Sequence, residues 1–255
     1  MLLRTVPARE GLLWVRQGFV WLSRKPWHTF ALGACYVLVQ AMLAQVPGLG
    51  GLLPLFTGQI ATVGFMAASR AIERGERVSP LLLLDGLRAP RPRPRNLLLL
   101  ALLYLTAAVA ALLLSTLFDG GTLLRLLLFD AMPSAKALQG GSLNQAALLA
   151  SCILVPLAAL FWLAPVLVSW YGMSAWQALF TNAIIVARNL PAFIVYATQW
   201  LALFVGVPLL LSLVATAAGA SSDESMLFGL PAAVVLMLAF YLSLYASARS
   251  LLPQD

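Results

Sequence analysis

Few residues in this sequence could carry acid–base or metal chemistry. The chain has one histidine, His28, and none of its nine acidic residues lies in the middle of a long apolar segment. Acid–base catalysis needs positioned titratable groups, and a metal site needs several ligands close together. We therefore expect no catalytic residue, no metal site and no cofactor, and we place His28 at the end of an apolar segment without a catalytic role.

Three large polar or aromatic side chains lie inside apolar segments: Gln59, Trp162 and Trp200. Gln59 is expected to hydrogen-bond between helices. Trp162 and Trp200 either pack inside a helix bundle or line a cavity. Pro165 follows Trp162 and removes a backbone hydrogen bond, which in a membrane must be compensated by neighbouring groups. These four residues are the candidates for packing or for a cavity.

Basic side chains are the third group with possible chemistry. Four arginines alternate with prolines in a short stretch between two apolar segments. Near a membrane surface each cation attracts anionic headgroups by about 1 kcal/mol. The alternative is that these charges serve only to stop translocation. The candidate headgroup ligands are Arg24, Lys25, Arg88, Arg91, Arg93, Arg95 and Arg188.

The composition indicates an integral membrane protein. Hydrophobic residues make up 62% and charged residues 10% of the 255 positions, whereas soluble domains carry about 25% charged residues. The formal net charge of +7 does not indicate nucleic-acid binding, because the basic residues flank apolar segments and form no compact basic domain. Cys35 and Cys152 lie within apolar segments, and we expect both to be free thiols.

Six apolar segments have the length that crosses a bilayer. About 20 helical residues span a hydrocarbon core of about 30 Å. The predicted fold class is all-α, a polytopic membrane helix bundle, with residues 1–255 forming a single integral membrane domain. Prolines 156 and 165 predict two kinks in the fourth span. The spans are expected at about 27–46, 49–70, 96–118, 146–170, 191–217 and 227–251.

Two further segments have the pattern of amphipathic helices that lie in the membrane interface. In residues 9–25 polar residues recur every seven positions, and Trp14 and Trp21 flank the apolar face. In residues 173–189 an apolar face alternates with a polar face that includes Asn182, while Ile185 breaks the pattern. Both helices are predicted to lie on the cytoplasmic side.

The connection between the second and third spans is expected to be partly helical and partly extended. Ser79 followed by Pro80 is typical of a helix start, and Gly86 is a candidate end for this short helix. Beyond it, prolines at positions 90, 92 and 94 favour an extended polyproline segment.

Each pair of spans thus follows an amphipathic or short helical segment that ends near an arginine: Arg24, Arg88 or Arg188. Three related hairpins are a hypothesis. The intervals of 64 and 100 residues between these arginines are unequal, so a strict repeat is not established.

The distribution of basic residues predicts the orientation of the chain. With six spans both termini lie on one side, and fourteen of the sixteen basic residues fall on that side. Only Arg125 and Lys136 fall on the other side. Because basic residues are retained in the cytoplasm, both termini are predicted to be cytoplasmic.

Three stretches carry a resemblance to a known family. They are Phe161-Trp162-Leu163-Ala164-Pro165, Val168-Ser169-Trp170-Tyr171-Gly172, and Arg188-Asn189 with Ala192-Phe193 and Val195-Tyr196. With the N-terminal arm and Asp119-Gly120-Gly121, they resemble an uncharacterised family of six-helix inner-membrane proteins of beta-proteobacteria. The resemblance covers nearly the whole chain; it implies a bacterial inner membrane and supplies no activity. More distantly, the order of helix, basic residue and span resembles the membrane domain of some glycerophosphodiester phosphodiesterases, whose catalytic half has no counterpart here.

These observations favour a non-catalytic inner-membrane protein that organises or senses anionic lipid, or that serves as an accessory subunit. The alternative is a passive transporter of lipid or a small solute, with a cavity near spans 2, 4 and 5. Ion-coupled transport is disfavoured because it commonly uses ionisable residues inside the membrane. The expected partners are anionic membrane lipids, with a second protein or another copy of the chain as a further candidate, and no nucleic acid.

Overall fold

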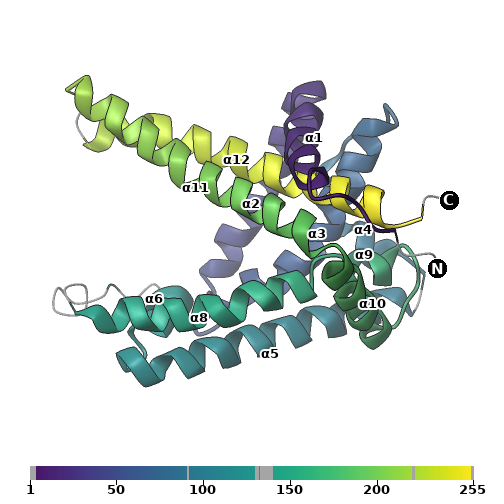
Figure 1. Cartoon of the computed structure of the whole chain (residues 1–255), viewed down its shortest axis with the longest axis horizontal. Coiled ribbons are helices and arrows are strands. Elements are labelled where there is room, and N and C mark those ends of the chain that lie inside the picture. The colour runs from purple at the N-terminus through teal and green to yellow at the C-terminus, as the bar shows by residue number, and fades with distance from the viewer. Residues whose placement is uncertain (1–3, 91, 130–131, 133–139, 220–221, 254–255) are drawn as a thin grey trace. The chain divides into compact units, whose positions relative to one another are not determined.

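A computed structural model describes residues 4–90, 92–129, 132, 140–219 and 222–253 (Figure 1). These residues form helices and connecting turns, with no strand among them. Six helical segments are long and apolar enough to cross a membrane, which confirms the predicted class of helical membrane protein. They are α2 (Pro26–Ala44), α3 (Leu52–Glu73), α5 (Arg93–Asp119), Gly141–Ser169, which contains α8 and α9, α11 (Leu190–Ala217) and the Gly229–Leu251 part of α12 (Ser222–Leu251).

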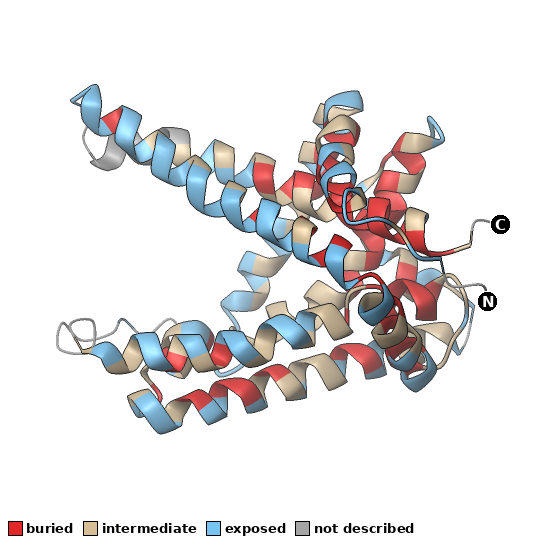
Figure 2. Ribbon diagram, in the orientation of Figure 1, coloured by how far each residue is buried: buried red, intermediate tan, exposed pale blue. Residues whose placement is uncertain are grey.

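The helices group into two compact units. The first unit comprises Met1–Ala34, Phe65–Leu82 and Ile185–Asp255, and the second comprises Cys35–Gly64 and Leu83–Ile184. Each of α2 and α3 therefore contributes residues to both units. The long apolar faces that remain exposed, such as the pale-blue face of α11 in Figure 2, have the composition expected of lipid-facing helix surfaces.

In the first unit, α1 (Glu10–Arg24) packs on α11 and α12, which lie side by side (Figure 1). A methyl group added to Gly11 would lie 2.3 Å from the carbonyl oxygen of Ala192, and one on Gly18 would lie 2.3 Å from that of Ala239. The backbone of α1 therefore touches the backbones of both helices. Protein side chains thus cover the face of α1 that carries Trp14, whereas the sequence pattern had suggested lipid.

In the second unit, α5 packs against α8 (Gly141–Leu160), and α6 (Thr122–Phe129) packs on both. The carboxylate of Asp119 accepts hydrogen bonds from the backbone N–H groups of Gly121 and Leu123, at 2.9 and 2.6 Å, which caps the start of α6. The short apolar segment after Asp119 thus folds into the helix bundle. Leu123 and Leu128 of this segment belong to a buried cluster with Leu112, Ala146 and Ala150.

The fourth span is interrupted once. Helix α8 continues through Pro156 and ends at Leu160, and α9 (Ala164–Ser169) begins after three non-helical residues. Pro165 has no N–H to donate to the carbonyl of Phe161, so the helix breaks in the turn before this proline. Of the two prolines expected to disturb this span, only Pro165 adjoins a break in the helix.

The connection to α5 differs from the expected extended segment. Pro92 has φ −90° and ψ 9°, which is far from the polyproline conformation. The backbone N–H of Arg93 donates to the carbonyl of Pro90 at 3.2 Å, which forms a turn. Pro94 then lies in the first turn of α5, where a missing N–H breaks no helical bond.

The short helix before this turn is η1 (Pro80–Leu84), followed by α4 (Asp85–Arg88). The hydroxyl of Ser79 accepts a hydrogen bond from the N–H of Leu81 at 3.3 Å, so Ser79 caps the start as predicted. Gly86 does not end the helix. It lies buried inside α4, where an added methyl group would meet the side chain of Leu97 at 2.6 Å.

Candidate functional site

The arginine segment of the second unit comprises residues 88–95 at the end of α4 and the start of α5. Arg88 and Arg95 are exposed and form no ion pair or hydrogen bond with any residue that the structure describes. Arg93 is half-buried, and its Nη1 donates to the carbonyl of Ser169 at 3.4 Å. Arg91 lies outside the described residues. The segment thus contains one arginine held against the protein and two free guanidinium groups.

An acidic residue beside this segment is already occupied. Trp170 donates from Nε1 to Oδ2 of Asp85 at 3.1 Å. Asp85 forms no ion pair with a described arginine. Because the carboxylate bonds to a neutral donor, it leaves Arg88 and Arg95 without a described counter-ion.

The basic candidates of the first unit divide in the same way. Arg24 and Arg188 are exposed at the ends of α1 and α10 (Ala175–Arg188), without partners among the described residues. Lys25 instead donates from Nζ to the carbonyl oxygens of Gly75, at 3.2 Å, and Glu76. Lys25 thereby satisfies backbone acceptors just beyond the end of α3, a structural contact that the sequence did not predict.

An ion pair in the first unit was also missed. Arg249 near the end of α12 pairs with Glu73 at the end of α3, and the hydroxyl of Tyr245 donates to Glu73 at 3.0 Å. The sequence signal was available, since an acidic and a basic residue end two spans on the same predicted side.

Trp200 is a packing residue in the first unit. Its side chain is 3% exposed. Its ring lies 5.3 Å from that of Phe240 and 5.4 Å from that of Phe204, measured between centroids, and it stacks on Phe19 at 5.8 Å. Aromatic rings at such distances stabilise a core beyond the area that they bury.

The other cavity candidates belong to the second unit. Gln59 is half-buried and makes no hydrogen bond with a described residue. The amide that joins α2 to α3 is instead Gln40, whose Oε1 accepts from the hydroxyl of Thr57 at 2.8 Å. Trp162 is half-buried at the break between α8 and α9, and Pro165 is buried just after it.

Asn182 of α10 completes the hydrogen bonding of that break. Its Oδ1 accepts from the N–H of Leu163 at 2.9 Å, and its Nδ2 donates to the carbonyl oxygens of Ala159 and Leu160 at 2.9 and 2.6 Å. In a continuous helix the N–H of Leu163 would donate to the carbonyl of Ala159. The amide is inserted between them and bonds to both, so it bridges the two helix ends.

The faces of α10 therefore differ from the prediction. Asn182 and Ile185 are 0% exposed, whereas Trp176 and Phe180 are 65% and 70% exposed. The predicted polar face points partly into the protein through Asn182, and the two aromatic residues of α10 point outward. Ile185, which broke the pattern, belongs to the buried face. The sequence signal for Asn182 was a proline inside a predicted span. Such a proline leaves nearby backbone groups in need of a polar side chain.

Asn189, seven residues beyond Asn182, has a similar role in the first unit. Its Oδ1 accepts from the N–H of Val6 at 2.8 Å, and its Nδ2 donates to the carbonyl oxygens of Arg4 and Ile185 at 3.2 and 2.8 Å. The side chain, 1% exposed, thus ties the N-terminal arm to the end of α10.

These helices and buried polar contacts are those of a multi-pass helical membrane protein. The chain is 38% identical over 253 residues to a probable inner membrane protein of Burkholderia thailandensis, in a match that covers 98% of this chain and 93% of the relative. The chain therefore belongs to the same family of inner-membrane proteins. This confirms the resemblance to an uncharacterised six-helix inner-membrane protein and the multi-pass inner-membrane localisation.

No family model matches the sequence, and no solved structure matches it. The comparisons give no support to the distant resemblance to membrane domains of glycerophosphodiester phosphodiesterases.

Proposed function

We propose that this inner-membrane protein is non-catalytic and that its arginine segment binds the headgroups of anionic lipids. The observation that carries the proposal is the state of Arg88 and Arg95, which are exposed and have no partner among the described residues. A guanidinium group can donate two parallel hydrogen bonds to a phosphate. Unpaired arginines beside a predicted membrane span are thus suited to lipid phosphates.

The surroundings of the two arginines support this proposal. The one carboxylate of α4, that of Asp85, accepts its hydrogen bond from Trp170. The segment also leads into α5, a helix of 27 residues whose N-terminal end carries partial positive charge. Gly86 packs α4 against Leu97 of α5, so Arg88 is held on a fixed element. These features favour a negatively charged ligand at this place.

The proposal includes the orientation of the chain. Fourteen of the sixteen basic residues lie on the side that carries both termini, which favours a cytoplasmic location for the arginine segment. Reporter fusions at residues 85, 135 and 222 test it. We expect cytoplasmic signal at residue 85 and periplasmic signal at the other two. A periplasmic reporter signal at residue 85 would contradict the orientation and the cytoplasmic headgroup site together.

The lipid proposal is tested with the double variant Arg88→Gln and Arg95→Gln. If each cation contributes about 1 kcal/mol, the affinity of the double variant for phosphatidylglycerol should fall about 30-fold. Native mass spectrometry of the purified full chain, titrated with phosphatidylglycerol or phosphatidylethanolamine, measures this change. The matched control is Arg74→Gln with Arg77→Gln, which removes two exposed cations on the same predicted side. An equal loss in both double variants would overturn the assignment to the arginine segment.

The alternatives from the sequence predict different results. A passive carrier with a cavity near Trp162 should lose flux in the Trp162→Ala variant and keep its flux when Arg88 and Arg95 are replaced. An accessory subunit should be recovered with a defined protein partner in a pull-down, irrespective of lipid retention.

A further inference from the structure

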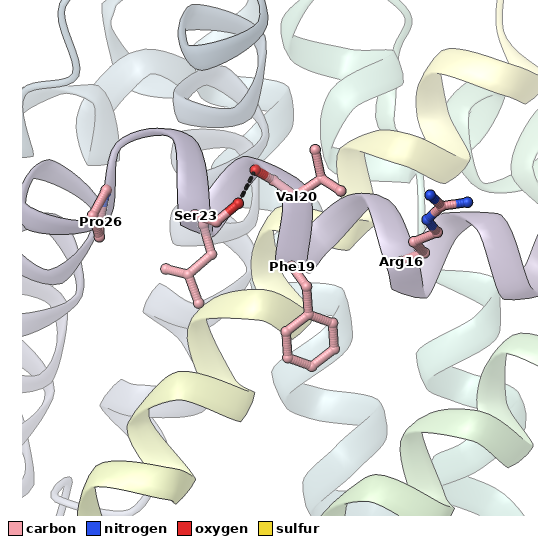
Figure 3. A pocket seen from close by; sticks show the side chains of 6 residues that line it. Arg16, Phe19, Val20, Ser23 and Pro26 are labelled. Carbon is pink, nitrogen blue, oxygen red and sulfur yellow. Dashed lines mark hydrogen bonds between the residues drawn. The ribbon is translucent and has the colours of Figure 1, made fainter.

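A groove with a volume of about 510 Å³ runs along α1 in the first unit (Figure 3). In Figure 3 Arg16 lies at one end and Pro26, the first residue of α2, at the other. The groove is largely open, so it can hold part of a molecule but cannot enclose a whole one. The residues that line it are Arg16, Phe19, Val20, Leu22, Ser23 and Pro26.

The lining is apolar except at one end. Phe19, Val20 and Pro26 offer no hydrogen-bonding side chain. The hydroxyl of Ser23 donates to the carbonyl of Val20 within the same helix, at 2.9 Å, as the dashed line in Figure 3 shows. Arg16 is exposed and forms no ion pair or hydrogen bond with the described part of the chain. The groove therefore matches a molecule with an apolar body and one anionic end.

The walls of the groove are held by the packing of α1. The ring of Phe19 stacks on Trp200 with 5.8 Å between centroids, and Leu22 is 7% exposed. Gly18, next to Phe19, lies against the backbone of α12, so this part of α1 cannot move closer to it. A preformed site binds its ligand without a large ordering cost.

The position of the groove indicates that membrane lipids are the amphiphiles available to occupy it. α1 is amphipathic and leads through Lys25 into α2, a candidate membrane span. Because α2 begins at Pro26, the end of α1 is close to the boundary between headgroups and acyl chains. The apolar end of the groove is therefore at the start of a span, and its charged end is at Arg16, ten residues earlier in the chain.

We propose that the groove binds one acyl chain of an anionic phospholipid, with the phosphate held by Arg16. This site is on α1 in the first unit, whereas the arginine segment belongs to the second unit. The proposal therefore does not depend on the proposed function.

The experiment uses the full chain in the Arg88→Gln, Arg95→Gln background, so that the arginine segment no longer contributes. Native mass spectrometry measures the affinity for phosphatidylglycerol and for phosphatidylethanolamine. Arg16→Gln removes the cation, and its control Arg9→Gln removes another exposed cation of the same region that does not line the groove. Ser23→Phe fills the groove from an exposed position, and its control Ser23→Ala removes the hydroxyl without filling the groove.

Arg16→Gln should weaken phosphatidylglycerol binding about fivefold and phosphatidylethanolamine binding less, because the ammonium group of that headgroup offsets the charge of its phosphate. Ser23→Phe should weaken the binding of both lipids, because it displaces the chain. Both controls should bind like the parent. Unchanged binding in Ser23→Phe, or equal losses in Arg16→Gln and Arg9→Gln, would overturn the proposal. If thermal unfolding shows that Ser23→Phe does not fold, the proposal is judged by the comparison of Arg16→Gln with Arg9→Gln alone.

Discussion

The two amphipathic helices α1 and α10 have similar patterns in the sequence but are held in different ways. Both are short, both end at an exposed arginine, and each precedes a pair of spans. In the first unit α1 is attached by buried aromatic rings and by glycines that touch other backbones. In the second unit α10 is attached by the buried amide of Asn182. The same periodicity therefore predicts a helix without predicting which contacts retain it.

The difference has an energetic consequence. When a substitution changes apolar packing, the loss of protein stability grows with the volume removed or added. Neighbouring side chains can move to reduce this loss. Buried backbone groups that lose their partner cannot relax in this way when no water is near. We therefore expect α10 to depend on one residue and α1 to depend on many.

The largest effect is expected for Asn182→Leu. It leaves the N–H of Leu163 and the carbonyl oxygens of Ala159 and Leu160 without this partner inside the bundle. The expected loss of stability is about 3 kcal/mol, the sum of three buried bonds of about 1 kcal/mol each. Thermal unfolding in detergent, followed by circular dichroism, measures it.

The control for Asn182→Leu is Thr181→Val, which changes a half-buried neighbour on α10 that has no described side-chain partner. It should unfold at the wild-type temperature. If the Asn182→Leu variant were as stable as the wild type, the break between α8 and α9 would have to be satisfied by other groups.

A smaller effect is expected for Gly18→Ala in α1. The added methyl group would lie 2.3 Å from the carbonyl oxygen of Ala239, so α1 and α12 must separate. Overpacking of this kind costs about 1–3 kcal/mol. Gly206→Ala in α11 is the matched control, because nothing lies within 4 Å of its added methyl group, and it should be neutral or slightly stabilising. If both substitutions gave the same unfolding temperature, the close contact of α1 with α12 would be refuted.

The sequence predicted the properties that depend on local patterns. Six apolar segments are long enough to cross a bilayer, and the periodicity of residues 9–25 and 173–189 coincides with α1 and α10. The sequence did not predict the partners of Asn182 or Lys25. These partners are distant in the chain, and they are backbone carbonyl groups that need a donor only because a helix ends there. The prediction of an extended segment at Pro92 was wrong. Proline fixes φ only, and at Pro92 the surrounding turn determines ψ.

The groove on α1 also could not be predicted from the sequence. Arg16 was one of five basic residues of the N-terminal arm, and nothing local distinguished it from Arg9. It lines the groove because α1 is anchored through Gly18 and turns at Lys25 into α2. Those contacts follow from tertiary packing.

The smallest effect is expected for the hydrogen bond between α1 and the end of α12. Trp14 donates from Nε1 to the hydroxyl of Ser250 at 2.9 Å. Ser250 is half-buried near the end of the span, where water can replace a lost partner. Bonds of this type in membrane proteins contribute about 0.6 kcal/mol on average. Ser250→Ala should therefore lower stability by about that amount, and Trp14→Phe by more, because it also removes buried ring area next to Phe193 and Tyr196. The double variant, compared with the two single variants, isolates the hydrogen bond. A coupling energy above about 2 kcal/mol would exceed the range measured for such bonds. It would mean that α1, like α10, depends on a single polar contact.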